Sequence, residues 1–266
     1  MSTQGPAAEA AIRNYQQDCF RCYLADVGEK VEPDGIAVPD PYTYPDGNPI
    51  RPLPPLHIAC GGLMIVGAYP SARFEFRPSK QGRGRHRLVP VADNLHPFAE
   101  EKYFDGQRVR TLVSGDGLRD HLLTKLGLRV EDCWITDLVK VFLYKPEHED
   151  SCGDACPGFH VPQLRTSYAK LAKASLPWLV KECALCQPKL VVTLGEEVAQ
   201  AVSEKEHATA DDLLKGDVQH PERLNGVPVM YLPHPDACRR TAKWRKKMAD
   251  FVKLIRPLLG LQGEKP

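Results

Sequence analysis

Four short apolar runs stand out along the chain, at residues 62–66, 133–136, 189–194 and 228–232. None of them alternates strictly with polar residues, as a strand with one solvent-facing side would. Continuous apolar runs of this length are typical of strands buried on both faces of a parallel sheet. We therefore predict a central sheet of four strands, with the second run continuing through Asp137–Val141.

Helical patterns separate the predicted strands. Leu118, Leu122, Leu123 and Leu126 recur at helical spacing and end at Gly127, a residue that suits a helix C-cap. Further helices are expected over residues 9–25, over 163–186 with a second segment opening at Pro177, from Glu196 onward, and over 240–259. Helices that alternate with strands in this way predict a three-layer α/β/α sandwich around a four-stranded, mostly parallel sheet.

Two stretches interrupt this alternation. Residues 33–55 are rich in proline and are expected to wrap the surface as an extended segment. Residues 72–114 are polar and aromatic with little periodicity, so we expect an irregular excursion that carries function. Because no Gly/Ser linker divides the chain, we expect one domain over residues 1–266, with an N-terminal helix and wrap (1–60) and a pocket insert (72–114).

Two loops follow predicted strands and lead into dense positive charge: Gly67–Ser71 and His234–Arg240. In an open α/β sheet, loops at the carboxyl ends of strands meet in the crevice where ligands bind. The basic residues are Arg73, Arg77, Lys80, Arg83, Arg85 and Arg87 after the first loop, and Arg239, Arg240, Lys243, Arg245, Lys246 and Lys247 in and after the second. The whole chain has a net charge of only +1, so these local clusters predict a phosphate-rich polymer as ligand.

Composition narrows the classes of protein to which the chain can belong. No apolar run is long enough to span a bilayer, and the N-terminus lacks the basic-then-apolar plan of a signal peptide, so we expect a cytoplasmic protein. Nine cysteines in a chain of this kind argue against a disulfide scaffold and for metal binding or ordinary buried thiols.

The order of elements and loop residues resembles the uracil-DNA glycosylase superfamily. The matching pattern is a strand followed by Gly-x-x-Pro-Ser, a strand ending in Asp-x-x-Lys, a third strand, and a last strand followed by His-Pro. The resemblance covers roughly residues 19–254 and is strongest in Pro188–Gly195, Trp134–Lys140 and Leu232–Arg240. It is closest to the bacterial iron–sulfur branch, which also opens with Cys-x-x-Cys.

This resemblance implies a monofunctional DNA glycosylase that flips a nucleotide out of the duplex and hydrolyses its glycosidic bond, leaving an abasic site. His234 matches the family histidine that stabilises the negative charge on the departing base. The alternative is a structural histidine that caps a turn. The resemblance also implies that the protein is a monomer and that its partner is DNA. By the same resemblance, substrate and DNA contacts are expected from Gly67, Ala68, Pro70, Ser71, Asp137, Lys140, Arg239 and Arg240.

The first loop departs from the family pattern. Ala68 and Tyr69 stand where relatives often hold a carboxylate or asparagine that orients the attacking water, and neither can act as a carboxylate base. The candidates for activating the water are therefore Glu75, Asp93 and Asp116, of which Glu75 enters the candidate catalytic set with His234, Asp137 and Tyr69. Each of these acids could equally be a solvated surface residue. Tyr69 is expected to pack over the base or the sugar.

Asp137 departs as well, because uracil-reading relatives have asparagine there. An asparagine amide donates to O4 of uracil and accepts from N3–H, whereas a carboxylate only accepts unless it is protonated. Two opposed acceptors would cost about 1–3 kcal/mol. A cytosine-type base suits Asp137 better, since its exocyclic amine donates to one oxygen and a protonated second oxygen donates to N3. The alternative is that Asp137 caps a turn and another residue reads the base.

The insert at 72–114 is much longer than the matching segment of the iron–sulfur branch. The family's base-stacking phenylalanine aligns with Leu112, so an aromatic side chain of the insert is expected to replace it; such stacking contributes roughly 1–3 kcal/mol. The candidates are Phe74, Phe76, Phe98, Tyr103 and Phe104.

A remodelled wall beside Asp137 would suit a bulky 5-substituted cytosine, hydroxymethylated or glucosylated as in some phage DNA. Excision of ordinary cytosine would damage the host's own DNA, so we infer a requirement for the modification and a role in anti-phage defence or repair. The alternatives are a uracil-DNA glycosylase of base-excision repair and a catalytically inactive DNA-binding homologue.

The cysteines fit the iron–sulfur branch only in part. The Cys-x-x-Cys pair matches its first two cluster ligands, but the next two ligand positions hold Val141 and Ser175. Two further cysteines lie in an insertion between these positions, with Cys183 and Cys186 as exchange ligands. We expect a [4Fe-4S] cluster, with zinc or no metal as the alternatives, on Cys19, Cys22, Cys152 and Cys156.

Overall fold

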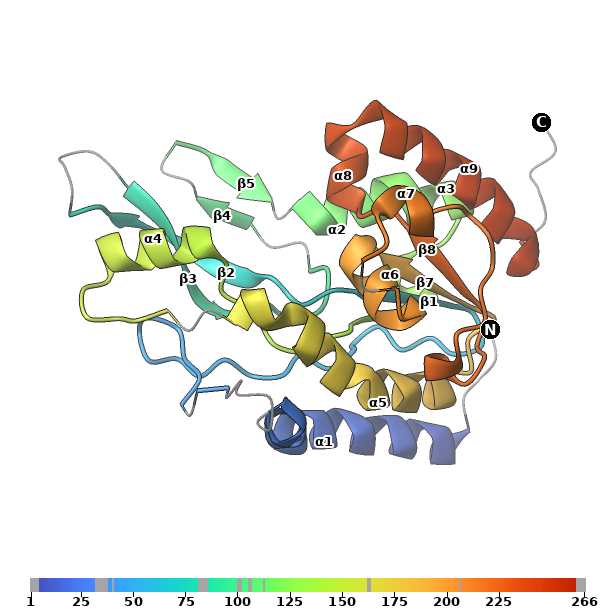
Figure 1. The fold of residues 1–266 in the computed structure, drawn as a ribbon, viewed down its shortest axis with the longest axis horizontal. Helices are drawn as coiled ribbons and strands as arrows, with labels where there is room; N and C mark the ends of the chain where they lie inside the picture. Colours follow the sequence, from blue (N-terminus) through green and yellow to red (C-terminus); the bar gives the residue numbers. More distant parts are fainter. Residues whose placement is uncertain are drawn as a thin grey trace.

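The computed structural model describes residues 5–31, 38–39, 41–80, 86–99, 102–104, 107–111, 113–161, 164–205 and 207–261. At its centre is a sheet of four parallel strands in the order β6-β1-β7-β8, three of which, β1, β7 and β8, are labelled in Figure 1. The strands are β1 (Leu63–Gly67), β6 (Cys133–Asp137), β7 (Leu190–Leu194) and β8 (Val229–Leu232), and all their residues are buried. The four predicted strands are confirmed, except that the second ends at Asp137.

Helices cover both faces of this sheet. Successive strand residues point to opposite faces, so Met64 and Val66 of β1 join one core while Leu63 and Ile65 join the other. The first core is closed by α1 (Pro6–Val31), α5 (Tyr168–Cys186) and α6 (Glu196–Ser203). The second is closed by the helical stretch at 113–126, by α8 (Pro235–Arg240) and by α9 (Ala242–Leu258). The three-layer α/β/α architecture is therefore confirmed.

The remaining helical elements are short. The stretch at 113–126 consists of α2 (Val113–Leu118), a π-helical turn (Arg119–Leu123) and α3 (Thr124–Leu126), and it ends at Gly127 in a left-handed conformation, as expected. Elsewhere lie α4 (Pro146–Ala155), α7 (Ala210–Leu213) and 3₁₀ turns at Val130–Asp132, Leu164–Ser167 and Glu222–Leu224. Pro177 lies inside α5 and does not open a new segment. Within the described ranges, no helix is both long and apolar enough to cross a membrane.

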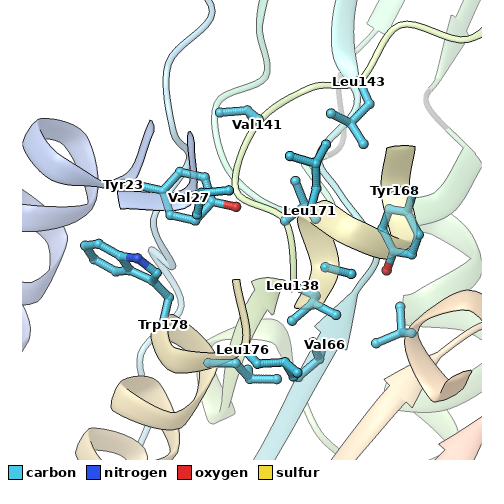
Figure 2. Packing of buried hydrophobic residues seen from close by; sticks show 14 of the residues in the cluster. Tyr23, Val27, Val66, Leu138, Val141, Leu143, Tyr168, Leu171, Leu176 and Trp178 are labelled. Atoms are coloured by element: carbon cyan, nitrogen blue, oxygen red, sulfur yellow. The ribbon is translucent and has the colours of Figure 1, made fainter. Parts of the chain in front are cut away.

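The N-terminal helix is an integral part of the first core. Figure 2 shows Tyr23 of α1 beside Trp178 of α5, with their ring centroids 5.6 Å apart. The Tyr23 hydroxyl pairs with Ser175 at 2.7 Å and accepts a hydrogen bond from the backbone amide of Lys140 at 2.9 Å. Helix α1 is thereby bonded both to α5 and to the loop that follows β6.

A fully buried ion pair between Lys140 and Glu182 lies beneath the end of β6. The Lys140 ammonium also donates to Thr136 Oγ1 at 2.7 Å and to the backbone oxygen of Asp137 at 2.6 Å, while Glu182 accepts from Trp134 Nε1 at 2.8 Å. A buried charge is tolerated when it is paired and hydrogen-bonded in this way. Lys140 has no exposed surface, so its predicted contact with DNA is wrong, and it braces the backbone of Asp137 instead.

The insert is more regular than its sequence indicates. The described part of 72–114 forms an antiparallel hairpin of β2 (Ala72–Pro78) and β3 (His86–Asp93), and a smaller one of β4 (Lys102–Phe104) and β5 (Val109–Thr111). The expectation of an irregular excursion is therefore wrong for these residues. In β2, charged residues alternate with Phe74 and Phe76, which is the period of a strand with one packed face.

Candidate active site

A cavity of about 450 Å³ opens at the carboxyl edge of the parallel sheet, a size common for small-ligand sites. Its wall includes the loop after β1 and residues that follow β6, β7 and β8, together with side chains from the insert. Residues from the carboxyl ends of all four strands meet at this cavity, because parallel strands end at the same edge of a sheet. Of the predicted site residues, the cavity is lined by Ala68, Tyr69, Pro70, Ser71, Asp137, His234 and Arg240.

The acids proposed from sequence to activate water lie elsewhere. Glu75 is on an exposed face of β2, 3.2 Å from Arg77, and Asp93 accepts a hydrogen bond from Tyr44 at 3.0 Å. Asp116 is ion-paired at 2.7 Å with an arginine three residues further along the chain. None of the three belongs to the cavity wall. The placement of Glu75 in the catalytic set is therefore corrected.

His234 presents a neutral imidazole to the cavity. It is the N-cap of α8, and its Nδ1 accepts a hydrogen bond from the backbone amide of Asp236 at 3.2 Å. Burial lowers the pKa of His234, aided by Lys145 and Arg240 and opposed by the acids Asp236 and Glu197. With Nδ1 acting as acceptor, the proton of the neutral ring is on Nε2. Nδ1 caps the helix while Nε2 can donate a hydrogen bond to a ligand, so His234 can serve both purposes.

Asp137 ends β6 directly opposite Gly67 in the parallel register, and it is only 2% exposed. A Cβ on Gly67 would come within 2.1 Å of Asp137 Oδ1 and 2.7 Å of the Phe98 ring, so only glycine allows this close approach. Burial raises the pKa of Asp137 to about 7, although Lys140 opposes the shift. Among the described residues, no hydrogen bond reaches its carboxyl oxygens, which are left available to a ligand.

Aromatic side chains form a second wall. Phe98 lines the cavity with a left-handed backbone (φ 57°), which is unusual for a bulky residue and holds its ring against Gly67. Beyond it, Phe142 stacks on His148 at 5.4 Å between centroids, and Phe74 approaches the same imidazole at 5.6 Å. Burial lowers the pKa of His148 to about 4, so this ring is neutral at physiological pH.

Two of the predicted aromatic candidates, Phe74 and Phe98, therefore reach the cavity. Phe76 instead stacks on His86 at 4.6 Å, on the hairpin and away from the cavity wall. The side chains of Tyr103 and Phe104, together with Leu112, lie outside the described residues, as do Arg83 and Arg85.

Sequence reasoning missed a charged group on the remaining wall. Glu197 lies in the first turn of α6 and is ion-paired with Arg165, whose guanidinium carbon sits 5.3 Å from the centroid of the Tyr69 ring. All three line the cavity. A signal for Glu197 existed, because it follows a strand and the turn at Gly195 (φ 101°), just as His234 follows β8. No local signal marks Arg165, which lies in the 3₁₀ turn Leu164–Ser167 and contacts Tyr69 and Glu197 at the site.

The four thiols proposed as metal ligands do not come together. Cys19 is buried in α1 and Cys22 is exposed on the same helix, whereas Cys152 is buried in α4 and Cys156 follows it (Figure 1). Within the described ranges, no three His, Cys, Asp or Glu side chains are arranged to hold a metal ion. This arrangement does not fit a four-thiolate cluster or zinc site, and no step proposed below uses a metal.

Comparison with known families agrees with this fold. Residues 62–259 match the model of the uracil DNA glycosylase superfamily, and the chain belongs to that superfamily. Members of the superfamily are DNA glycosylases, hydrolases that act on DNA. No curated protein matches the chain.

Proposed function

We propose that this protein is a monofunctional DNA glycosylase that excises a 5-substituted cytosine, such as a hydroxymethylated or glucosylated one, and leaves an abasic site. The observation that carries the specificity is the Asp137 carboxyl, which is buried at the cavity wall, has no hydrogen bond from the described residues, and has a pKa of about 7. A role against modified phage DNA or in repair would follow from such a substrate.

A protonated Asp137 matches the Watson–Crick edge of cytosine. Its hydroxyl can donate to N3 while its other oxygen accepts from the exocyclic amine. Uracil presents the acceptor O4 and the donor N3–H at the same two positions. It would pair with Asp137 only if the proton were on the other carboxyl oxygen. Gly67 and Phe98 fix the carboxyl against the sheet, and the Lys140 ammonium holds the backbone oxygen of the same residue at 2.6 Å. The carboxyl is therefore held in one position at the cavity wall.

His234 is suited to the departing base. As the glycosidic bond breaks, its electron pair leaves with the base, and negative charge develops on the ring oxygen O2. A neutral imidazole donating from Nε2 can stabilise this charge. Because His234 is neutral, the site does not have to hold an imidazolium cation, whose desolvation would cost free energy.

The cavity also offers room and charge for the rest of the nucleotide. Phe74, Phe142 and His148 form an apolar wall against which a substituent on C5 could pack. Phe98 can stack on a flipped base. Lys145, Arg165 and Arg240 are among the lining residues and could contact backbone phosphates, although Arg165 and Arg240 are ion-paired with Glu197 and Asp236.

The test is a panel of matched duplex and single-stranded oligonucleotides that carry uracil, hypoxanthine, cytosine, or hydroxymethylated or glucosylated cytosine at one position. Alkali treatment after incubation cleaves any abasic site. We expect cleavage at the modified cytosines, with His234→Ala reducing it about 100-fold or more while DNA affinity is retained. His220→Ala, in an exposed turn, is the matched control. Cleavage at uracil alone would indicate a repair uracil glycosylase, and DNA binding without cleavage an inactive homologue.

A further inference from the structure

Hydrolysis of a glycosidic bond requires a group that orients the attacking water, and Ala68 and Tyr69 of the first loop do not supply a carboxylate. Within the described part of the chain, three carboxyl groups line the cavity: Asp137, Asp236 and Glu197. Asp137 is buried against Gly67 at the end of β6. Asp236 is bound into the start of α8 and is ion-paired with Arg240. Glu197 is also ion-paired, but its side chain is 44% exposed against 25% for Asp236, so it is the lining carboxylate most open to water.

The surroundings of Glu197 fix its position but leave it an acceptor. Its Oε1 is held by the Arg165 guanidinium, which lies across the rings of Tyr69 and Tyr168 at 5.3 and 5.2 Å. No hydrogen bond from a described residue reaches Oε2, and the side chain is 44% exposed, so water can approach it. One oxygen is therefore anchored and the other is free to accept a proton.

A hydroxyl that lacks a hydrogen-bond partner among the described residues lies near Glu197, although the side chain that carries it does not line the cavity. Tyr168 is 5% exposed, yet no group in the described part of the chain hydrogen-bonds its hydroxyl. Its ring packs on Tyr69 at 6.0 Å between centroids and carries the Arg165 guanidinium. Buried hydroxyls without a protein partner are normally bonded to ordered water.

We propose that Glu197 is the catalytic carboxylate that orients and deprotonates the hydrolytic water, an inference that rests on the glycosylase function proposed above. The C1′–N bond breaks and its electron pair leaves with the base, whose charge His234 stabilises. The water oxygen forms the new bond to C1′, and its proton passes to Glu197 Oε2. The anionic carboxylate also stabilises the positive charge that C1′ carries in the transition state, while Arg165 holds the carboxylate in place.

The test compares Glu197→Gln with Glu196→Gln in single-turnover excision. Glutamine keeps an oxygen acceptor for Arg165 but cannot take the proton. We expect Glu197→Gln to slow excision about 100-fold or more while DNA affinity changes less than about twofold. Glu196→Gln is the matched control, since Glu196 is exposed on the same turn, bonds Gln200 at 3.1 Å, and does not line the cavity. It should excise at the wild-type rate.

A binding measurement separates a catalytic role from a structural one. DNA with a cationic azasugar at the target position mimics the charged transition state, and DNA with a neutral tetrahydrofuran does not. The wild type should bind the cationic analogue more tightly, and Glu197→Gln should abolish this preference. Excision by Glu197→Gln at the wild-type rate would overturn the inference and leave the glycosylase function standing. A wild-type protein that excises nothing would overturn both.

Discussion

Replacement of Asp137 by asparagine should change the pH dependence of stability in a direction that the structure fixes. Asp137 has an ordinary pKa of 3.8 when the chain is unfolded and one of about 7 when it is folded, chiefly because burial penalises its charge. Between about pH 4 and pH 7 the unfolded chain has released a proton that the folded protein retains. The folded state therefore loses stability as the pH rises through this window, and the loss is complete above about pH 7.

The size of this loss follows from the two pKa values. The difference is about three units, and each unit corresponds to about 1.4 kcal/mol, so the ionised carboxyl lowers the free energy of unfolding by up to about 4 kcal/mol. Asp137→Asn keeps the shape of the side chain and removes the ionisation. The stability of the variant relative to wild type should therefore rise by up to about 4 kcal/mol between pH 4 and pH 8.

Urea unfolding of the two proteins at a series of pH values measures this difference directly, because the titration of all other groups cancels. Asp18→Asn, at an exposed position of α1, is the control and should show a nearly constant difference from wild type. A constant difference for Asp137→Asn would refute the argument, since it would mean that the Asp137 carboxyl ionises in the folded protein as it does in the unfolded chain.

Three further outcomes are expected. Excision of a cytosine-type base should fall as the pH rises through about 7, because Asp137 then loses the proton it donates to N3; a rate that is flat from pH 6 to 8.5, about one to two units around that pKa, would contradict this. Arg239→Ala with Arg240→Ala should weaken binding to all DNA sequences and flatten its salt dependence, and an unchanged slope would remove both from the DNA path. Because the four thiols lie apart, anaerobically purified protein should contain no stoichiometric iron or zinc; a brown protein bleached by Cys19→Ser with Cys22→Ser would restore the cluster.

The sheet and its active edge could be predicted from the sequence because they depend on local signals. Apolar runs mark the four buried strands, and Asp137 at the end of β6 and His234 after β8 lie at the expected edge. The hairpins of the insert were missed because the alternation of charged and aromatic residues in Ala72–Pro78 is short and lies beside proline. The pattern was present but was outweighed by the polar composition around it.

Other parts of the site depend on packing that no local pattern reveals. Lys140 is positively charged, as DNA-binding residues often are, but it is buried in the core in an ion pair with the distant Glu182 of α5. Arg165 reaches the cavity only because Tyr168 and Tyr69 support its guanidinium. Glu182 lies far along the chain from Lys140, and Tyr69 lies far from Arg165, so tertiary structure rather than sequence spacing decides the environment of these side chains.

Whether Asp137 reads a cytosine-type base can be decided by one ratio of excision rates. The ratio compares one oligonucleotide carrying either 5-hydroxymethylcytosine or uracil, and it is measured for wild type and Asp137→Asn at pH 7. We predict that the wild type favours the modified cytosine and that the variant shifts the ratio toward uracil by about 10-fold or more, since the amide supplies a donor for O4 and an acceptor for N3–H. A wild-type protein that removes uracil efficiently and leaves every cytosine derivative intact would contradict the claim.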